Sequence, residues 1–323
     1  MPRADLIVNL VKAGSQGDTK LLHSTVEALA AEERAKNHHQ LADKLVSNLQ
    51  PAQRNLSAPN VVRAYDAGHG GLLYDVNPVR GLDDLLLEDD TITAVREVIE
   101  EQHRRDLLGS YGVEPRHRIL LAGPPGNGKT SLAEAIASEL MVPLFVVRYE
   151  AVIGSFLGET SSRLKKLFDF VRTHQCVLFF DEFDTLGKER GDEHETGEVK
   201  RVVSSLLLQI DSLPSHVVVV TATNHPELLD RAVWRRFQLR LELPAPTSKQ
   251  SEAWLKRFQE QLGQPLGFTA KALAAELAPA NFSELQQFCE DIHRRYILSL
   301  PSGNVKGIVR ERLQQWRKKF SIK

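Results

Sequence analysis

A glycine-rich stretch in the first half of the chain has the residue types and spacing needed to bind phosphate groups. It reads GPPGNGKT, from Gly123 to Thr130. Glycines at these positions let backbone N–H groups curl around phosphate oxygens, and a following helix N-terminus adds partial positive charge. In such a loop Lys129 reaches the β- and γ-phosphates, and the Thr130 hydroxyl binds Mg²⁺. The predicted phosphate-contacting residues are Gly123, Pro124, Pro125, Gly126, Asn127, Gly128, Lys129, Thr130 and Ser131.

Acidic and amide side chains follow two later apolar stretches. CVLFFDE ends in Asp181 and Glu182, and HVVVVTATN ends in Asn224. Asp181 is suited to complete the Mg²⁺ shell, and Glu182 to orient or deprotonate the attacking water. The Asn224 amide can hydrogen-bond both that water and the γ-phosphate, with a turn-capping role as the alternative. Alone the acids would read as a solvated turn, but beside a phosphate-binding loop they predict hydrolytic chemistry.

Buried parallel strands are needed to position these motifs. RILLAG, PLFVVR, CVLFFDE and HVVVVTATN are continuous apolar runs, each followed by a helical pattern. Such runs are typical of strands covered on both faces of a parallel sheet, so residues 81–244 are predicted to form an α/β domain. After Pro244 the apolar positions recur at helical spacing, and residues 245–323 are predicted to be a helical domain.

The first eighty residues divide into two parts. Apolar residues at helical spacing in three segments predict a small three-helix bundle over residues 1–50. Prolines and glycines interrupt the pattern over residues 51–80, which predicts a linker.

Composition limits the partners. The formal net charge is -1 and the pI is about 6.8, which disfavours global attraction to nucleic acid or an anionic membrane. Cys176 and Cys289 have no metal-binding or redox spacing. The N-terminal apolar run is too short for a signal peptide, and no stretch approaches ~18 apolar residues. The sequence therefore predicts a cytoplasmic protein without a membrane anchor.

The motifs together resemble one family. GPPGNGKT, FFDEFD, TATN and LLDRAVWRRF occur in the order and at the spacing of the AAA ATPases, with the first two as Walker A and Walker B motifs. The chain is similar to the protein-remodelling clade of katanin and spastin, and to small stand-alone bacterial AAA ATPases. The resemblance covers roughly residues 78–300. It implies a P-loop AAA large domain with a helical lid, ATP and Mg²⁺ as cofactors, and a homo-hexameric ring.

The resemblance also implies arginine fingers. Arg235 and Arg236 would reach the nucleotide of a neighbouring subunit, where a guanidinium is worth about 10³–10⁵ in rate. A basic helix end is the alternative. In the lid, NFSELQQF replaces the clade's Ser-Gly-Ala stretch, so no lid arginine is assigned. The segment 81–84 resembles the entry into the large domain, which flanks the adenine.

A further implied feature is a central channel. Phe156, Leu157 and Gly158 match the aromatic, hydrophobic and glycine positions of the family's first pore loop. Such an aromatic can grip an extended polypeptide, and Gly158 would permit a tight turn. A buried core phenylalanine is the alternative. Residues 187–199 would form a second, polar pore loop, or simply a solvated charged run.

Three functions stay open. The first is a remodeller or unfoldase that draws a protein client through the pore, with the N-terminal bundle recruiting it. The second is an ATP-gated activator of a partner enzyme, such as a protease encoded nearby. The third is a DNA-directed AAA ATPase, supported only by the basic segment 309–323 with its Trp316. That segment also reads as an amphipathic terminal helix, so nucleic acid is the disfavoured partner.

Overall fold

The computed structural model describes residues 25–26, 28–31, 62–64, 71–148, 157–184, 196–301 and 303–320. The chain divides into two compact units, residues 1–60 and 61–323. In the first unit the described residues are helical. The predicted three-helix bundle of residues 1–50 otherwise lies outside the described residues and stays a prediction.

A seven-stranded sheet forms the centre of the second unit, in the order β1-β2-β4-β5-β6-β3-β7. The five neighbours from β4 to β7 are parallel, whereas β1 and β2 join one edge as antiparallel strands. The strands are β1 Val62–Ala64, β2 Leu73–Val76, β3 Arg118–Ala122, β4 Leu144–Val147, β5 Cys176–Phe180, β6 Val217–Thr223 and β7 Leu239–Glu242. The α/β prediction and its four apolar strands, β3 to β6, are confirmed. Strand β7 was missed, because only one of its four residues is fully buried.

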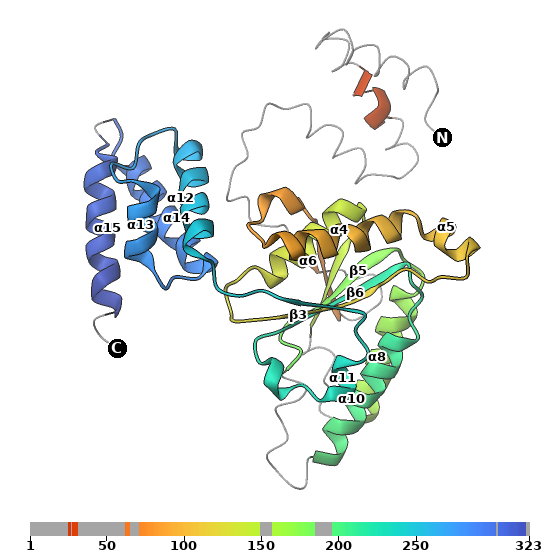
Figure 1. The fold of residues 1–323 in the computed structure, drawn as a ribbon. Helices are drawn as coiled ribbons and strands as arrows, with labels where there is room; N and C mark the ends of the chain where they lie inside the picture. The colour runs from red at the N-terminus through yellow and green to blue at the C-terminus, as the bar shows by residue number, and fades with distance from the viewer. Residues whose placement is uncertain are drawn as a thin grey trace. The chain divides into compact units, whose positions relative to one another are not determined.

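Helices cover both faces of the sheet (Figure 1). Helices α4 and α6 pack on one face, around Val98 and Leu132, and α8 and α10 pack on the other, around Leu167 and Ile210. The helices are α4 Asp89–His103, α5 Arg105–Ser110, α6 Lys129–Leu140, α8 Leu157–Val171, α10 Thr196–Asp211, α11 Arg231–Trp234, α12 Ser248–Leu262, α13 Ala270–Leu277, α14 Phe282–Leu298 and α15 Val305–Phe320, with short 3-10 turns at Leu82–Asp84 and Pro226–Leu228.

The linker predicted over residues 51–80 is corrected in its described part, residues 62–64 and 71–80. Strands β1 and β2 lie inside it and extend the sheet, with Leu73 and Val76 buried. A strand this short shows only two buried positions, so its pattern is hidden among the surrounding glycines and prolines.

The helical segment after Pro244 is confirmed. Helices α12 to α15 form a lid with a core of its own, which includes Leu255, Ile292 and Val309. Trp316 packs against this core, with its ring 6.3 Å from that of Phe288. The aromatic that supported DNA binding is therefore a packing residue. Among the described residues, no helix is long and apolar enough to cross a membrane.

Candidate functional site

The phosphate loop connects β3 to α6, and the predicted phosphate-contacting residues all lie in it or in the first helical turn. Gly123, Gly126 and Gly128 have φ values of 141°, 78° and 87°, which non-glycine residues rarely adopt. Gly128 is the N-cap of α6 and provides no side-chain cap. The N–H groups of the first turn are therefore left for a ligand, and a helix N-terminus favours an anion.

Two of the glycines are also required by close packing. A Cβ atom on Gly123 would lie 2.3 Å from the carbonyl oxygen of Leu243, and one on Gly126 would lie 2.8 Å from Asn281 Oδ1. Asn281 belongs to the lid, where it caps α14. The backbone N–H of Ser283 in α14 also donates to the Gly126 carbonyl at 3.0 Å. The lid stretch NFSELQQF thus touches the phosphate loop directly.

Lys129 is buried and folded back onto this loop. Its Nζ donates to the carbonyl oxygens of Gly123, at 2.6 Å, and Pro124, at 3.0 Å. Burial lowers the pKa of Lys129, while Asp181 and Asp184 oppose that shift. The ammonium group lies where it can exchange two neutral carbonyls for phosphate oxygens, which bind it more strongly.

The two predicted metal ligands lie together. Thr130 Oγ1 donates to Asp181 Oδ2 at 3.2 Å, although the residues are far apart in sequence. Glu182 follows directly, and its N–H donates to Asp181 Oδ1 at 2.9 Å. Glu182 has a φ of 48°, a left-handed conformation that is uncommon for glutamate and is often found at functional sites. The structure therefore brings the predicted base beside the predicted metal ligands.

Asn224 is joined to the same acidic turn through a residue that sequence reasoning missed. The buried Asp184 accepts hydrogen bonds from Thr223 Oγ1 at 3.0 Å and from the Asn224 N–H at 3.3 Å. The only sequence signal was its place at the end of FFDEFD. Asp184 thus fixes the end of β6, with Asn224, against the acidic turn that follows β5.

The residues fit an ATP molecule with Mg²⁺. Asn127 is 3% exposed, and neither its Oδ1 nor its Nδ2 has a hydrogen-bond partner among the described residues. Asn224 Oδ1 is likewise buried without one. Unpaired buried polar groups are costly, so both amides suit a site that a polar ligand completes. A hydroxyl and a carboxylate suit Mg²⁺, which usually keeps waters and takes phosphate oxygens.

The two predicted finger arginines differ in their surroundings. Arg236 forms an ion pair with Asp211, the last residue of α10. Asp211 also accepts from Arg118 at 3.0 Å. Arg235 is exposed and has no ion pair with a described residue. The structure thus leaves Arg235 accessible and holds Arg236 within its own chain.

The pore residues fall largely outside the described part. Phe156 lies outside the described residues, as does most of the segment 187–199. Leu157 and Gly158 begin α8, so Gly158 has helical backbone and not the predicted tight turn. Helix α8 begins at Leu157, before Gly158, where the sequence had suggested a turn. The pore assignment itself stays a prediction.

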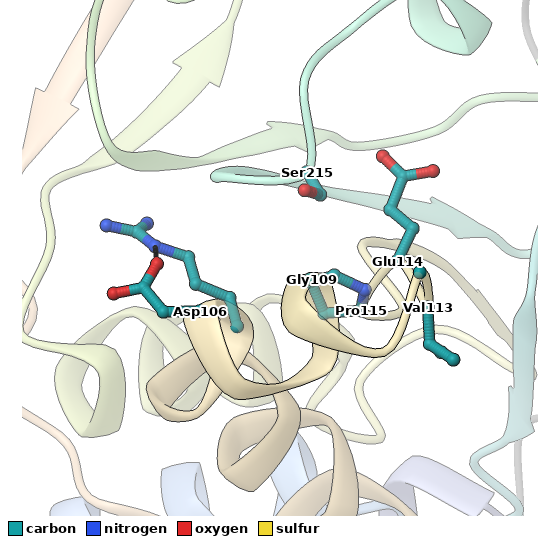
Figure 2. A pocket seen from close by; sticks show the side chains of 8 residues that line it. Asp106, Gly109, Val113, Glu114, Pro115 and Ser215 are labelled. Carbon is teal, nitrogen blue, oxygen red and sulfur yellow. Dashed lines mark ion pairs between the residues drawn. The ribbon is translucent and has the colours of Figure 1, made fainter.

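A surface hollow of about 370 Å³ lies away from these residues (Figure 2). Asp106 and Glu114 lie on opposite sides of it. Ser215, from the loop between β5 and β6, also lines it. Glu114 and Ser215 precede β3 and β6, so the hollow is at the amino ends of the strands. The phosphate loop and the acidic residues Asp181 and Glu182 instead follow the carboxyl ends of strands, which is the edge at which α/β sheets bind ligands.

Known proteins match the chain along most of its length. The profile of the ATPase family associated with various cellular activities (AAA) matches residues 119–245. The uncharacterized AAA family ATPase y4kL of Sinorhizobium fredii is 33% identical over 302 residues, which cover 92% of this chain and 90% of that protein. A putative 26S proteasome regulatory subunit homolog of Methanothermobacter thermautotrophicus is 31% identical over 195 residues, or 59% of this chain and 52% of that protein. The peroxisomal ATPase pex6 of Schizosaccharomyces pombe is 35% identical over 183 residues, 54% of this chain but only 19% of that protein.

The matched region contains the phosphate loop, the acidic turn and the Asn224 turn in one site. The Sinorhizobium relative extends the match through almost the whole chain. The chain therefore belongs to the AAA family of ATPases and hydrolyses ATP.

Proposed function

We propose that this ATPase works as a homo-hexameric ring that remodels or unfolds a protein client through a central pore. The observation that carries the proposal is the arginine pair after α11. Arg236 is anchored by Asp211, while Arg235 is exposed on the outside of its subunit. An exposed guanidinium next to an anchored one is suited to complete a neighbour's nucleotide site. Each subunit would then depend on the next for hydrolysis.

Within one subunit, the chain's own residues divide the chemistry. Lys129 and the N–H groups of the loop bind the phosphates, and Thr130 and Asp181 would hold Mg²⁺. The metal supplies neutralising charge for the phosphate oxygens. Glu182 accepts a proton from the attacking water, and Asn224 orients that water. Arg235 of the adjacent subunit stabilises charge on the transferred phosphoryl group.

Relatives support a protein client. One matched relative is named as a proteasome regulatory subunit homolog and another as a peroxisomal ATPase. The chain spans only about half and one fifth of these proteins, so their activities are not carried over as such. The katanin- and spastin-like clade remains our proposal from the four ordered motifs GPPGNGKT, FFDEFD, TATN and LLDRAVWRRF. Phe156, Leu157 and Gly158 are the proposed client contacts.

A second candidate is an ATP-gated activator of a partner enzyme such as a protease. The proteasome-related names of two relatives favour it, since those proteins are named as regulators. We disfavour a DNA-directed role because Trp316 packs against the lid core. A cytoplasmic setting is in keeping with the two cysteines, which are free and buried.

Mixed oligomers test the shared site. Arg235→Ala and Glu182→Gln proteins should each be nearly inactive alone, but their mixture should regain part of the ATPase activity, because a Glu182→Gln subunit supplies Arg235 to the intact site of its neighbour. Arg240→Ala, which removes an exposed arginine on β7, is the matched control and should be as active alone as the wild type. No recovery of activity in the mixture, with subunit exchange verified by labelled protein, would show that Arg235 acts only within its own subunit.

A further inference from the structure

An arginine outside the recognised motifs lies against the first turn of the phosphate-loop helix. Arg80 Nη1 donates to Ser131 Oγ at 2.6 Å. Ser131 is the third residue of α6, directly after Thr130. The guanidinium therefore lies beside the helix N-terminus, where the phosphates of a nucleotide bind.

The backbone that carries Arg80 is fixed to the same helix. The N–H groups of Val79 and Arg80 donate to Glu134 Oε1, at 3.1 Å and 3.3 Å. Two residues later, the Leu82 N–H donates to Glu139 Oε1 at 3.1 Å. Glu134 and Glu139 both belong to α6. Because the backbone is held at several points, the segment that carries Arg80 needs little further ordering when a ligand binds.

An ordinary ion pair does not account for the position of the guanidinium. Arg80 Nε lies 4.0 Å from Glu134 Oε2, the limit of an ion pair, whereas Nη1 is close to the uncharged Ser131 hydroxyl. The Arg80 side chain is 44% exposed. A guanidinium has five N–H donors, and among the described residues only one makes a side-chain hydrogen bond. Several donors are thus available at the open side of the helix terminus.

The charge at this place favours an anion. The helix N-terminus and the Arg80 guanidinium both contribute positive charge at Ser131, and the buried Glu134 carboxylate is directed to the backbone of residues 79–80. The Asp181 carboxylate is bonded to Thr130, where the metal would bind. Guanidinium groups match phosphate geometry and can bind two of its oxygens at once.

We propose that Arg80 binds the α-phosphate of the nucleotide. Lys129 is placed for the β- and γ-phosphates, and Thr130 for the metal. Ser131 lies one residue further along α6 than Thr130. The Arg80 guanidinium bonded to Ser131 is therefore placed for the remaining phosphate, the one nearest the nucleoside. The inference rests on the proposed placement of ATP on this loop, but it holds whether or not a ring forms. Arg80 would thus contribute, from the large domain, a positive charge to the nucleotide site, for which no arginine of the lid was assigned.

Arg80→Gln tests the inference, since glutamine can still hydrogen-bond Ser131 but carries no charge. Competition against fluorescent ADP would measure the affinities of ATP, ADP, AMP and adenosine. All three nucleotides should bind about 10-fold more weakly, because each loses one charge-assisted contact, and adenosine should be unaffected. Arg104→Gln, which removes an exposed arginine paired with Glu100, is the matched control and should change none of the four.

The other outcomes have distinct meanings. An equal loss for adenosine would mean that Arg80 only anchors the segment beside the base, which overturns the inference. Unchanged affinities, or a loss for ATP alone, would overturn it as well. Ser131→Ala separates the anchor from the charge and should weaken the nucleotides less than Arg80→Gln does. Failure of the wild-type protein to bind ATP would contradict the proposed function instead.

Discussion

Asp211 forms an ion pair with Arg236 and so links the end of α10 to the arginine pair that follows α11. Its second carboxylate oxygen accepts from Arg118 Nη1 at 3.0 Å, at the start of β3. One carboxylate therefore holds two arginines from distant parts of the chain. Arg235, the neighbour of Arg236, is left exposed.

We therefore predict unequal effects for the two arginines. Arg235→Ala should lower kcat by at least about 100-fold, because it removes a cation from the transition state. Arg236→Ala should mainly lower stability, by roughly 1 kcal/mol, since the pair with Asp211 is partly exposed. Steady-state kinetics and urea unfolding of both variants measure this. A larger loss of kcat in Arg236→Ala would reverse the assignment.

Replacing Glu182 should separate ATP binding from hydrolysis. Glu182→Gln leaves the phosphate loop intact but cannot accept the proton of water, so turnover should fall by at least about 100-fold. ATP should then remain bound and favour the larger oligomer, which light scattering with ATP detects. Glu260→Gln, on the exposed surface of α12, should behave as wild type. Normal hydrolysis by Glu182→Gln would remove this residue from the mechanism.

Phe156 distinguishes a channel from a core role. Phe156→Ala should melt like the wild-type protein and keep its basal ATPase activity, but fail to process a client or support a partner enzyme. A core phenylalanine would instead leave a cavity costing about 3–5 kcal/mol. Phe168→Ala, at a fully buried position of α8, is the control that should show this loss in thermal melting. Full client processing by Phe156→Ala would mean that the protein acts as an ATP-gated scaffold and does not thread a client through a pore.

His117 should make stability depend on pH. The residue is 2% exposed, its Nδ1 donates to the Pro115 carbonyl at 3.2 Å, and its Nε2 has no hydrogen-bond partner among the described residues. Burial holds the pKa of His117 below its ordinary value of 6.5. In the unfolded chain His117 therefore binds a proton near pH 6.5, whereas in the folded chain it does so only at a lower pH. Stability should fall as the pH drops from about 6.5 toward the folded pKa, and this term should be absent above about pH 7.5.

His117→Gln removes that titration. Urea unfolding between about pH 5.5 and pH 8 should show a shallower loss of stability at the acidic end in the variant than in the wild type. An identical slope in both proteins would mean that other groups cause the acid sensitivity.

The phosphate loop and the acids could be predicted from the sequence because each depends on local order. GPPGNGKT needs only a strand before it and a helix after it, and both are encoded next to it. The strands β3 to β6 could also be predicted, because burial on both faces requires continuous apolar residues. Short strands with few buried residues carry no such signal, so β1 and β2 were placed in a linker and β7 was missed.

Only the tertiary structure decided which distant side chains meet. Asp184 with Thr223, Asp211 with Arg236, and Arg80 with Ser131 are pairs whose partners come from different elements. A charged or hydroxyl side chain has many possible partners in a sequence of this length, and no local propensity selects among them. The packing of α6 and the strand order bring these groups within hydrogen-bond distance. The sequence by itself therefore determined the chemistry of the site, and the fold decided which residues support it.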